Sequence, residues 1–324
     1  MSASEEWPVS EPRTLDLEGP VDRVHVRLVN GTVNVVGTDR ATARLEISHL
    51  EGPPLIVTHT ADGELTVAYE DLPWKGFLRW LDRKGWRRSA DVSLAVPSGA
   101  RVEVGVVGAS AVLSGVGGDT AVRGVAGDTT VVALSGTVRV DTVSGSLDAQ
   151  GLTGDLRFNS VSGDLTVIDA CGAAVKADSV SGNMIVDMDG KGADLALNTV
   201  SGEIAIRMPH PADARVEFNT ASGEVSNAFE GLDVSGQWGA KHITGTLGAG
   251  SGRLKASTVS GSIALLRRPP AEDGGPYDSG DSPDAGGEGP YGTGEGPGAE
   301  GEGPGAEGEG PSDSTPKNSA GKAL

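Results

Sequence analysis

DTVSG, at residues 141–145, is a turn whose close copies return five more times along the chain. The copies are NSVSG (159–163), DSVSG (178–182), NTVSG (198–202), NTASG (219–223) and STVSG (257–261). Successive glycines of the first five turns are 18, 19, 20 and 21 residues apart. A looser series of turns, around Gly154, Gly172 and Gly192, falls nine or ten residues from each neighbour. Each period therefore contains two turns, which indicates a repeated supersecondary unit.

The segments between these turns alternate apolar and polar residues. Examples are VRVDTV from residue 138, LRFNSV from residue 156, VKADSV from residue 175 and LALNTV from residue 195. This alternation is strand spacing. Short strands at this interval also suit an antiparallel sandwich. A sandwich has no reason to repeat one turn at every second position, whereas a parallel solenoid stacks equivalent residues. We therefore predict an all-β fold, a parallel β-solenoid (β-helix) with coils of about 18–21 residues.

The repeated turn predicts specific structural roles. Glycine supplies positive φ at a corner, and Ser, Thr, Asn or Asp bonds the neighbouring backbone and stacks into ladders. The first five turn glycines should line up along one edge in successive coils. The aliphatic residues that follow the turns, Leu165, Ile185 and Ile204, should face the core. The structural turn glycines are Gly145, Gly163, Gly182, Gly202, Gly223 and Gly261.

The pattern divides the chain into four parts. Residues 1–20 are expected to form an N-terminal arm. Residues 21–96 hold a first coil at 24–37 and an irregular β region, with strands at ARLEIS (43–48), PLIVTHT (54–60) and ELTVAYE (64–70). Residues 97–268 form the solenoid repeats. Residues 269–324 form a tail that is expected to be disordered, because it has too few apolar groups to offset ordering entropy.

The tail dominates the charge of the 324-residue chain, which has a formal net charge of −19. Gly-Glu-Gly-Pro recurs there every seven residues, and residues 271–324 carry 12 acidic and 2 basic side chains. This composition suits a solubilising tail or a docking arm for a basic partner. Nucleic acid is not expected as a partner of so acidic a chain.

One basic segment, PWKGFLRWLDRKGWRRS at residues 73–89, interrupts the irregular β region. Its apolar residues at 74, 77, 78 and 81 share one face of a short amphipathic helix expected near 74–84. Such a helix could cap the open end of the solenoid or pack internally. The less favoured interpretation is that its Trp and Arg residues bind an anionic membrane surface or an acidic protein. The resulting interaction surface contains Trp74, Lys75, Phe77, Arg79, Trp80, Arg83, Lys84, Trp86, Arg87 and Arg88.

Catalytic, cofactor and metal sites are not expected. The repeated serines have no histidine at a recurring offset to activate them, and the five histidines lack metal-ligand spacing. The chain also lacks the tandem Gly-Gly-x-Gly-x-Asp of calcium-binding repeats. A carbohydrate-active enzyme would need clustered carboxylates and sugar-stacking aromatics, yet the repeats are nearly free of Trp and Tyr.

Cysteine and hydropathy patterns bear on localisation. Cys171 is the single cysteine, so the chain has no internal disulfide, which fits a reducing compartment. No basic stretch followed by an apolar run opens the sequence, and no window reaches the length of a spanning helix. We therefore expect a cytoplasmic protein, with peripheral membrane association through residues 73–89 left open.

Chained Val-Ser-Gly-acid-aliphatic units also carry a resemblance. The run SLAVPSGARVEVGVVGASAVLSGVGG from residue 93, followed by VSGDLTV, VSGNMIV and VSGEIAI, resembles the DUF4097 family of "putative adhesin" β-strand repeat proteins, in an actinobacterial form. The likeness covers about residues 20–268. It implies a parallel β-solenoid and brings no catalytic residues.

Three functions follow as hypotheses. The first is a non-catalytic scaffold that binds another protein or a repetitive ligand along its regular surface. The alternative is an envelope-associated or stress-linked factor that contacts anionic membrane through residues 73–89. The third, least favoured, is a carbohydrate-active β-helix enzyme.

Overall fold

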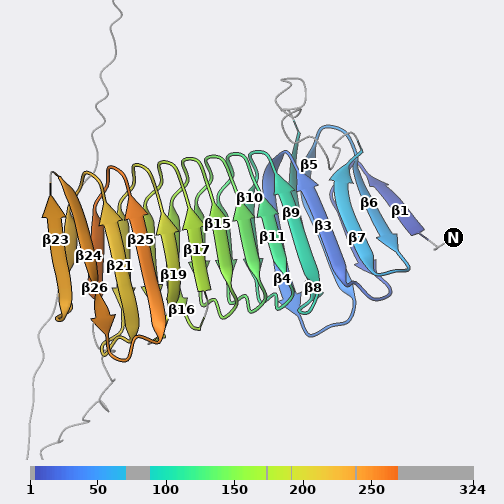
Figure 1. The fold of residues 1–324 in the computed structure, drawn as a ribbon. Coiled ribbons are helices and arrows are strands. Elements are labelled where there is room, and N and C mark those ends of the chain that lie inside the picture. The colour runs from blue at the N-terminus through green and yellow to red at the C-terminus, as the bar shows by residue number, and fades with distance from the viewer. Residues whose placement is uncertain (1–3, 71–87, 173, 191, 238, 269–324) are drawn as a thin grey trace, which may run out of the picture. The chain divides into compact units, whose positions relative to one another are not determined.

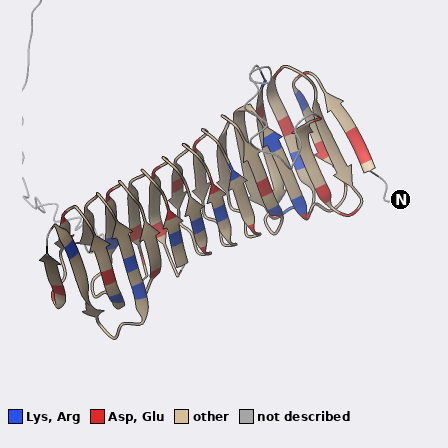
Figure 2. Ribbon diagram, turned by 45° about the horizontal axis from the view of Figure 1, so that its top comes forward, with Lys and Arg blue, Asp and Glu red and all other residues tan. Residues whose placement is uncertain are grey.

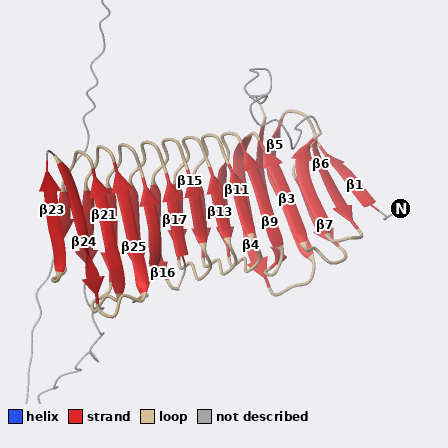
Figure 3. Cartoon of the chain, viewed as in Figure 1, coloured by secondary structure: helices blue, strands red, loops and turns tan. Residues whose placement is uncertain are grey.

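All regular structure in the computed structural model is β-strand, over the described residues 4–70, 88–172, 174–190, 192–237 and 239–268 (Figures 1 and 3). The strands form two sheets that face each other. The larger, sheet A, runs in spatial order β1 (Ser4–Val9), β6 (Leu55–Thr60), β7 (Glu64–Tyr69), β3 (Arg23–Leu28), β9 (Arg101–Val106), β11 (Thr120–Arg123), β13 (Val138–Asp141), β15 (Leu156–Asn159), β17 (Ala174–Asp178), β19 (Asp194–Asn198), β25 (Gly252–Thr258), β21 (Ala214–Thr220), β24 (Ala240–Leu247) and β23 (Leu232–Gln237).

The second sheet, sheet B, has two strands fewer among the described residues. Its spatial order is β2 (Arg13–Leu17), β5 (Ala43–Glu51), β8 (Ser89–Pro97), β4 (Asn30–Thr38), β10 (Ser110–Ser114), β12 (Thr129–Val132), β14 (Leu147–Gln150), β16 (Leu165–Ala170), β18 (Met184–Met188), β20 (Ile204–Met208), β26 (Ile263–Arg267) and β22 (Val225–Asn227).

Each coil of the central region contributes one strand to each sheet, and the coils stack in parallel, which confirms the predicted solenoid. In sheet A, Val138 pairs with Leu156, Leu156 with Val175, and Val175 with Leu195. These side chains point inward and are buried. Stacked Val, Leu, Ile and Ala rows fill the space between the sheets, and Phe158 and Phe218 are among the largest buried side chains.

The predicted core positions are correct at Leu165 and Ile204, which are buried, and wrong at Ile185, which is 50% exposed. Ile185 is the third residue after Gly182 rather than the second. The second, Met184, pairs with Leu165 and Ile204 and occupies the core position. Because side chains alternate between faces of a strand, a shift of one residue puts Ile185 on the outer face of sheet B.

The turn glycines stack as predicted, with one change of order. Gly163 follows Gly145, and Gly182 and Gly202 continue the stack. Gly202 is then followed by Gly261, and Gly223 lies beyond it, so the prediction that Gly223 adjoins Gly202 is wrong. The reason is that β25 and β26 lie between the coil of β19 and β20 and the coil of β21 and β22.

The physical role of these glycines also differs from the prediction. None of the six has positive φ. Instead, a Cβ added at any of them would lie 1.9–2.1 Å from a glycine carbonyl oxygen of the preceding coil. The turn therefore requires glycine because two backbones approach closely, which is another recognised use of this residue.

Both ends of the solenoid contain a coil inserted out of chain order. At the N-terminal end, β3 and β4 lie between β7 and β8 on one side and β9 and β10 on the other. The strands beyond these coils pair antiparallel, as β1 does with β6 and β2 with β5. Residues assigned from sequence to an N-terminal arm thus form the edge strands β1 and β2. The strands predicted within 43–70 are β5, β6 and β7.

Candidate binding surface

The turn that follows each of the five sheet A strands β13, β15, β17, β19 and β25 presents an exposed valine. These valines form one line at consecutive coils: the Val161 N–H donates to the Val143 carbonyl at 3.2 Å, and the Val259 N–H donates to the Val200 carbonyl at 3.2 Å. Their exposed fractions lie between 37% and 52%. We call this line the valine ridge, and its members are Val143, Val161, Val180, Val200 and Val259.

The serine and threonine of the motif hold the ridge in place. The Ser162 hydroxyl donates to the Val143 carbonyl of the preceding coil at 3.3 Å, and the equivalent Ser144 and Ser181 hydroxyls make the same contact. Ser160, one position before the ridge valine, is buried and accepts the Gly163 N–H at 2.7 Å. The Val161 side chain points to solvent because the side chains of its two neighbours, Ser160 and Ser162, hydrogen-bond to the backbone.

A polar ladder runs beside the ridge on the outer face of sheet A. It alternates acid and amide at Asp141, Asn159, Asp178 and Asn198. The Asn159 amide donates to Asp141 at 2.6 Å, and the Asn198 amide donates to Asp178 at 2.8 Å. The alternation keeps carboxylates from stacking directly on one another, which would be unfavourable at strand spacing.

The first acid of this ladder, Asp141, has a pKa shifted by its surroundings. Burial alone would raise the pKa of Asp141, but hydrogen bonds from Arg139 and Asn159 outweigh it and lower the pKa below the ordinary 3.8. Arg139 lies two residues before Asp141 and begins a row of basic residues, in which it pairs with Arg157 and Arg157 pairs with Lys176 on the next strands of sheet A. Figure 2 shows basic bands recurring on successive strands of this sheet.

At its N-terminal end the ladder borders a groove of about 430 Å³. Gly105 and Gly124 have no side chains and so leave space in the groove lining. Arg27 and Arg123 lie on the two strands that flank Gly105 and pair with it. Two ridge valines line the other side of the groove. Glu103 pairs with both Arg123 and the Nδ1 of His25, the latter at 3.3 Å. The groove therefore combines apolar walls with a rim of paired charges, as ligand sites often do.

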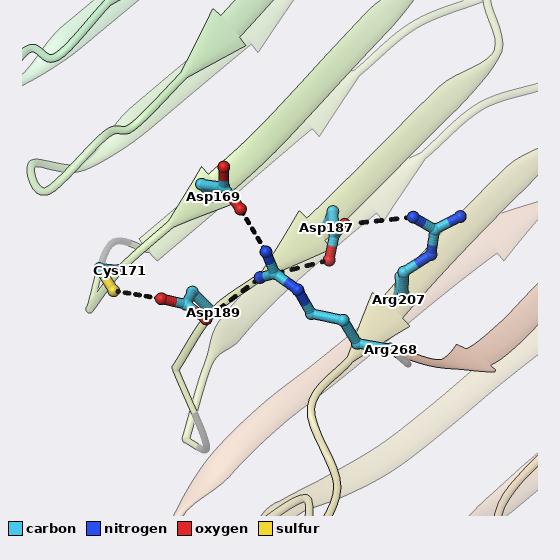
Figure 4. Close-up of polar contacts among 6 residues, drawn as sticks. All are labelled: Asp169, Cys171, Asp187, Asp189, Arg207 and Arg268. Carbon is cyan, nitrogen blue, oxygen red and sulfur yellow. Dashed lines mark hydrogen bonds and ion pairs between the residues drawn. The ribbon is translucent and has the colours of Figure 1, made fainter. Parts of the chain in front are cut away.

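The repeat is broken on sheet B by an ion-pair cluster (Figure 4). Arg268 reaches back across two coils, contacting Asp169 and donating to Asp189 at 3.1 Å, and it lies 3.8 Å from Asp187. Arg207 pairs with Asp187 at 3.3 Å. A bulge between Val167 and Ala170 in β16 precedes this cluster, and Asp169 has positive φ.

The chemistry of this cluster indicates a structural clip. The hydrogen bond from Arg268 to Asp169 raises the pKa of the guanidinium, so its charge is permanent. The nearby Cys171 thiol donates to Asp189 at 3.5 Å, and desolvation together with this bond raises its pKa. A raised pKa reduces the thiolate fraction, so Cys171 is a poor nucleophile at neutral pH. In the part of the chain that the structure describes, no three His, Cys, Asp or Glu side chains are grouped to hold a metal ion.

The interaction surface and the helix predicted near 74–84 lie outside the described residues, except for Arg88. The Asn30 amide donates to the Arg88 carbonyl at 3.0 Å, and the Arg88 guanidinium lies 5.4 Å from the Tyr69 ring centre. The expected disordered tail lies outside them as well. No helix in the described ranges is long and apolar enough to cross a membrane.

The valine ridge was missed from the sequence, because an aliphatic residue inside a repeated motif ordinarily belongs to the core. A signal was present: the ridge valine follows the last inward residue of its strand by an odd number of positions, as Val161 follows Phe158. The alternation of Asp and Asn at the first motif position similarly signalled the polar ladder.

Comparisons with known proteins give one family match and matches among solved structures. The family model of Toastrack DUF4097 matches residues 33–266. Among solved structures, a putative cell adhesion protein from Clostridium sporogenes is 12% identical with a TM-score of 0.24, over 83% of this chain and 100% of that one. A putative adhesin from Bacteroides fragilis is 10% identical with a TM-score of 0.40, over 82% and 97%. No curated protein matches the chain.

Proposed function

Since the chain belongs to the Toastrack DUF4097 family, we propose that it is a non-catalytic scaffold that binds another protein or a repetitive ligand along the valine ridge. The observation that carries this proposal is the ridge itself. Contiguous exposed apolar patches on soluble proteins often mark binding surfaces. The regular spacing suits an elongated partner that touches several coils at once.

The neighbouring polar groups support recognition by contact rather than chemistry. The acids of the polar ladder are held by amide and guanidinium donors, as Asp141 is by Asn159 and Arg139. Asp141 is a poor general base, because its pKa is lowered rather than raised. The acids of the ladder can still offer hydrogen bonds that orient a ligand beside the ridge.

A triple substitution of ridge residues tests the proposal. Val161→Thr, Val180→Thr and Val200→Thr together keep the side-chain shape but replace three methyl groups with hydroxyls. At about 0.8–1 kcal/mol for each buried methyl group, we expect roughly a hundredfold weaker partner binding. The matched control is Ile185→Thr, an equally exposed position on the outer face of sheet B.

The readout is quantitative affinity purification from the source organism, followed by binding measurements with the purified partner. Partner loss in the triple variant but not in the control supports the ridge. Equal recovery with both variants contradicts it. Depolymerisation of any member of a polysaccharide panel by the wild-type protein would favour an enzyme instead.

A second candidate function is peripheral contact with anionic membranes through residues 73–89. The observation that favours it is the concentration of three Trp and six basic residues in this segment of an acidic chain. Tryptophan fluorescence with anionic vesicles at low salt tests it. A blue shift that a Trp74, Trp80, Trp86 triple Ala variant abolishes supports membrane contact, and the absence of any shift eliminates it.

A further inference from the structure

The C-terminal end of sheet A is built differently from its N-terminal end. Beyond the coil of β21 and β22, the antiparallel strands β24 and β23 extend sheet A, while sheet B ends at the three-residue strand β22. The hairpin therefore overhangs the solenoid by two strands. Among the described strands, β23 pairs with β24 alone.

The overhang leaves part of the apolar inner face exposed, at Val234. Val234 lies directly opposite Ile243, so both side chains point to the same side of the sheet. Ile243 is buried, whereas Val234 is 57% exposed, the highest value among the large hydrophobic residues that the structure describes. Leu232, on the same face, is only partly buried. A further strand beyond β23 would give Val234 a cross-strand neighbour on this face.

The opposite edge of sheet A carries features that discourage further strand pairing. In β1, Glu5 and Glu6 are exposed, and Pro8 has no N–H to donate. Charged residues and proline are the usual protection of an edge strand. In contrast, β23 (LDVSGQ) contains one acid, Asp233, and no proline. An edge strand of this kind is a template for pairing with another chain.

The sequence of β23 is complementary to itself when two copies run antiparallel. With Val234 opposite Val234 of the second copy, Leu232 faces Gly236 and Asp233 faces Ser235. Like charges are not opposed, and the bulky leucine meets a glycine. Directly opposed residues point to the same side of a sheet, so this register places the two Val234 side chains next to each other on one face of the joined sheet.

We propose that β23 is a homodimerisation edge, at which two copies of this chain join sheet A into one continuous sheet around a two-fold axis at Val234. Such an isologous contact is self-limiting, because it uses the free edge of both copies. Its small size predicts concentration-dependent association in the micromolar range.

The test uses sedimentation of the full chain, wild type and two charge variants, Val234→Lys and Val234→Glu. The wild type should reach twice the chain mass. Each variant should associate at least about tenfold more weakly, because it opposes like charges at the two-fold axis. A mixture of the two variants should recover dimers. The control, Ile185→Lys, places lysine at a similarly exposed position on sheet B and should dimerise like the wild type.

Three results would overturn the proposal: a wild type that stays monomeric up to about 100 µM, dimerisation that survives Val234→Lys, or charge variants that fail to associate when mixed. Because a misfolded charge variant would also fail to dimerise, a disulfide cross-link provides an independent test. Opposed Cα atoms about 4.5–5.5 Å apart permit a disulfide, so Val234→Cys in a Cys171→Ser background should form a covalent dimer on oxidation. Ile185→Cys in that background should not, and equal cross-linking of both would also overturn the proposal.

Discussion

Replacing Gly163 with alanine puts a methyl group against the backbone of the neighbouring coil. The added Cβ would lie 1.9 Å from the Gly145 oxygen, where ordinary contact begins at 3.4 Å, so the two turns must separate by about 1.5 Å. That movement strains the 2.8 Å bond from the Ser162 N–H to the Val143 carbonyl and the 3.2 Å bond from Val161 to the same oxygen. Overpacking at about 1–3 kcal/mol and two bonds at about 1 kcal/mol each predict a loss of about 3–5 kcal/mol.

Substitution with asparagine distinguishes a glycine required by close backbone contact from a glycine required by positive φ. Asparagine tolerates the left-handed region better than alanine does, so at a turn that needs positive φ it should cost less. At Gly163 the close approach makes Asn no better than Ala. At Gly151, where φ is +64° and the nearest atoms are 3.9 Å away, Asn should cost less than Ala. Gly99→Ala, with nothing within 4 Å of the added Cβ, is the neutral control.

Urea denaturation followed by circular dichroism gives the loss of stability, and hydrogen exchange shows where it falls. Because neighbouring coils are the interacting units of a solenoid, exchange should increase most in the coils that contain Gly145 and Gly163. A loss below about 0.5 kcal/mol for Gly163→Ala, the level of an ordinary surface substitution, would refute the close-contact argument. So would a clear advantage of Asn over Ala at this position.

Three further expectations concern the core, the clip and the polar ladder. Leu165→Ala should cost about 2–5 kcal/mol, whereas Ile185→Ala should cost less than about 0.5 kcal/mol; similar losses in urea denaturation would contradict the observed register. Arg268→Gln leaves the largely buried Asp187 with Arg207 as its remaining partner, so hydrogen exchange in β26 should rise, and unchanged exchange would argue against a clip. Asp141 has a lowered pKa, so its carboxylate stabilises the fold above its ordinary pKa of 3.8, and this contribution disappears as the pH falls through the lowered value. Asp141→Asn should therefore be less stable than the wild type at pH 7, and the gap in urea midpoint should close in acid; a gap that does not depend on pH would contradict this.

The period and alternation of the sequence were sufficient to predict the solenoid, because stacking like residues on like is what a repeated turn encodes. The same uniformity hid the order of the last coils. Gly202, Gly223 and Gly261 carry nearly the same motif, so the motif alone cannot distinguish which coil adjoins which. The order depends on the β23–β24 hairpin, which reverses the chain so that β25 pairs between β19 and β21. This tertiary arrangement cannot be read from the local sequence.

The misassigned core residue and the missed ridge have related causes. In GNMIV, residues 182–186, three apolar residues follow one another, so alternation gives no phase and Ile185 could be mistaken for Met184. At the valine ridge, side-chain hydroxyls such as that of Ser162 bond to backbone and turn the valine outward. Sequence shows the apolar residue but not the backbone acceptor that decides its direction.

The insertion of β25 and β26 between two coils that precede them in the sequence changes how the solenoid can unfold. When coils follow chain order, the outermost coil unravels from a free chain end. Here the outermost coil belongs to residues 209–251, which are held at one end by β20 and at the other by β25. Fraying therefore releases a closed loop, which gains less conformational entropy than a free end of the same length. Tension applied beyond Arg268 would load β26, an interior strand bonded on both sides to β20 and β22, and would have to shear two ladders at once.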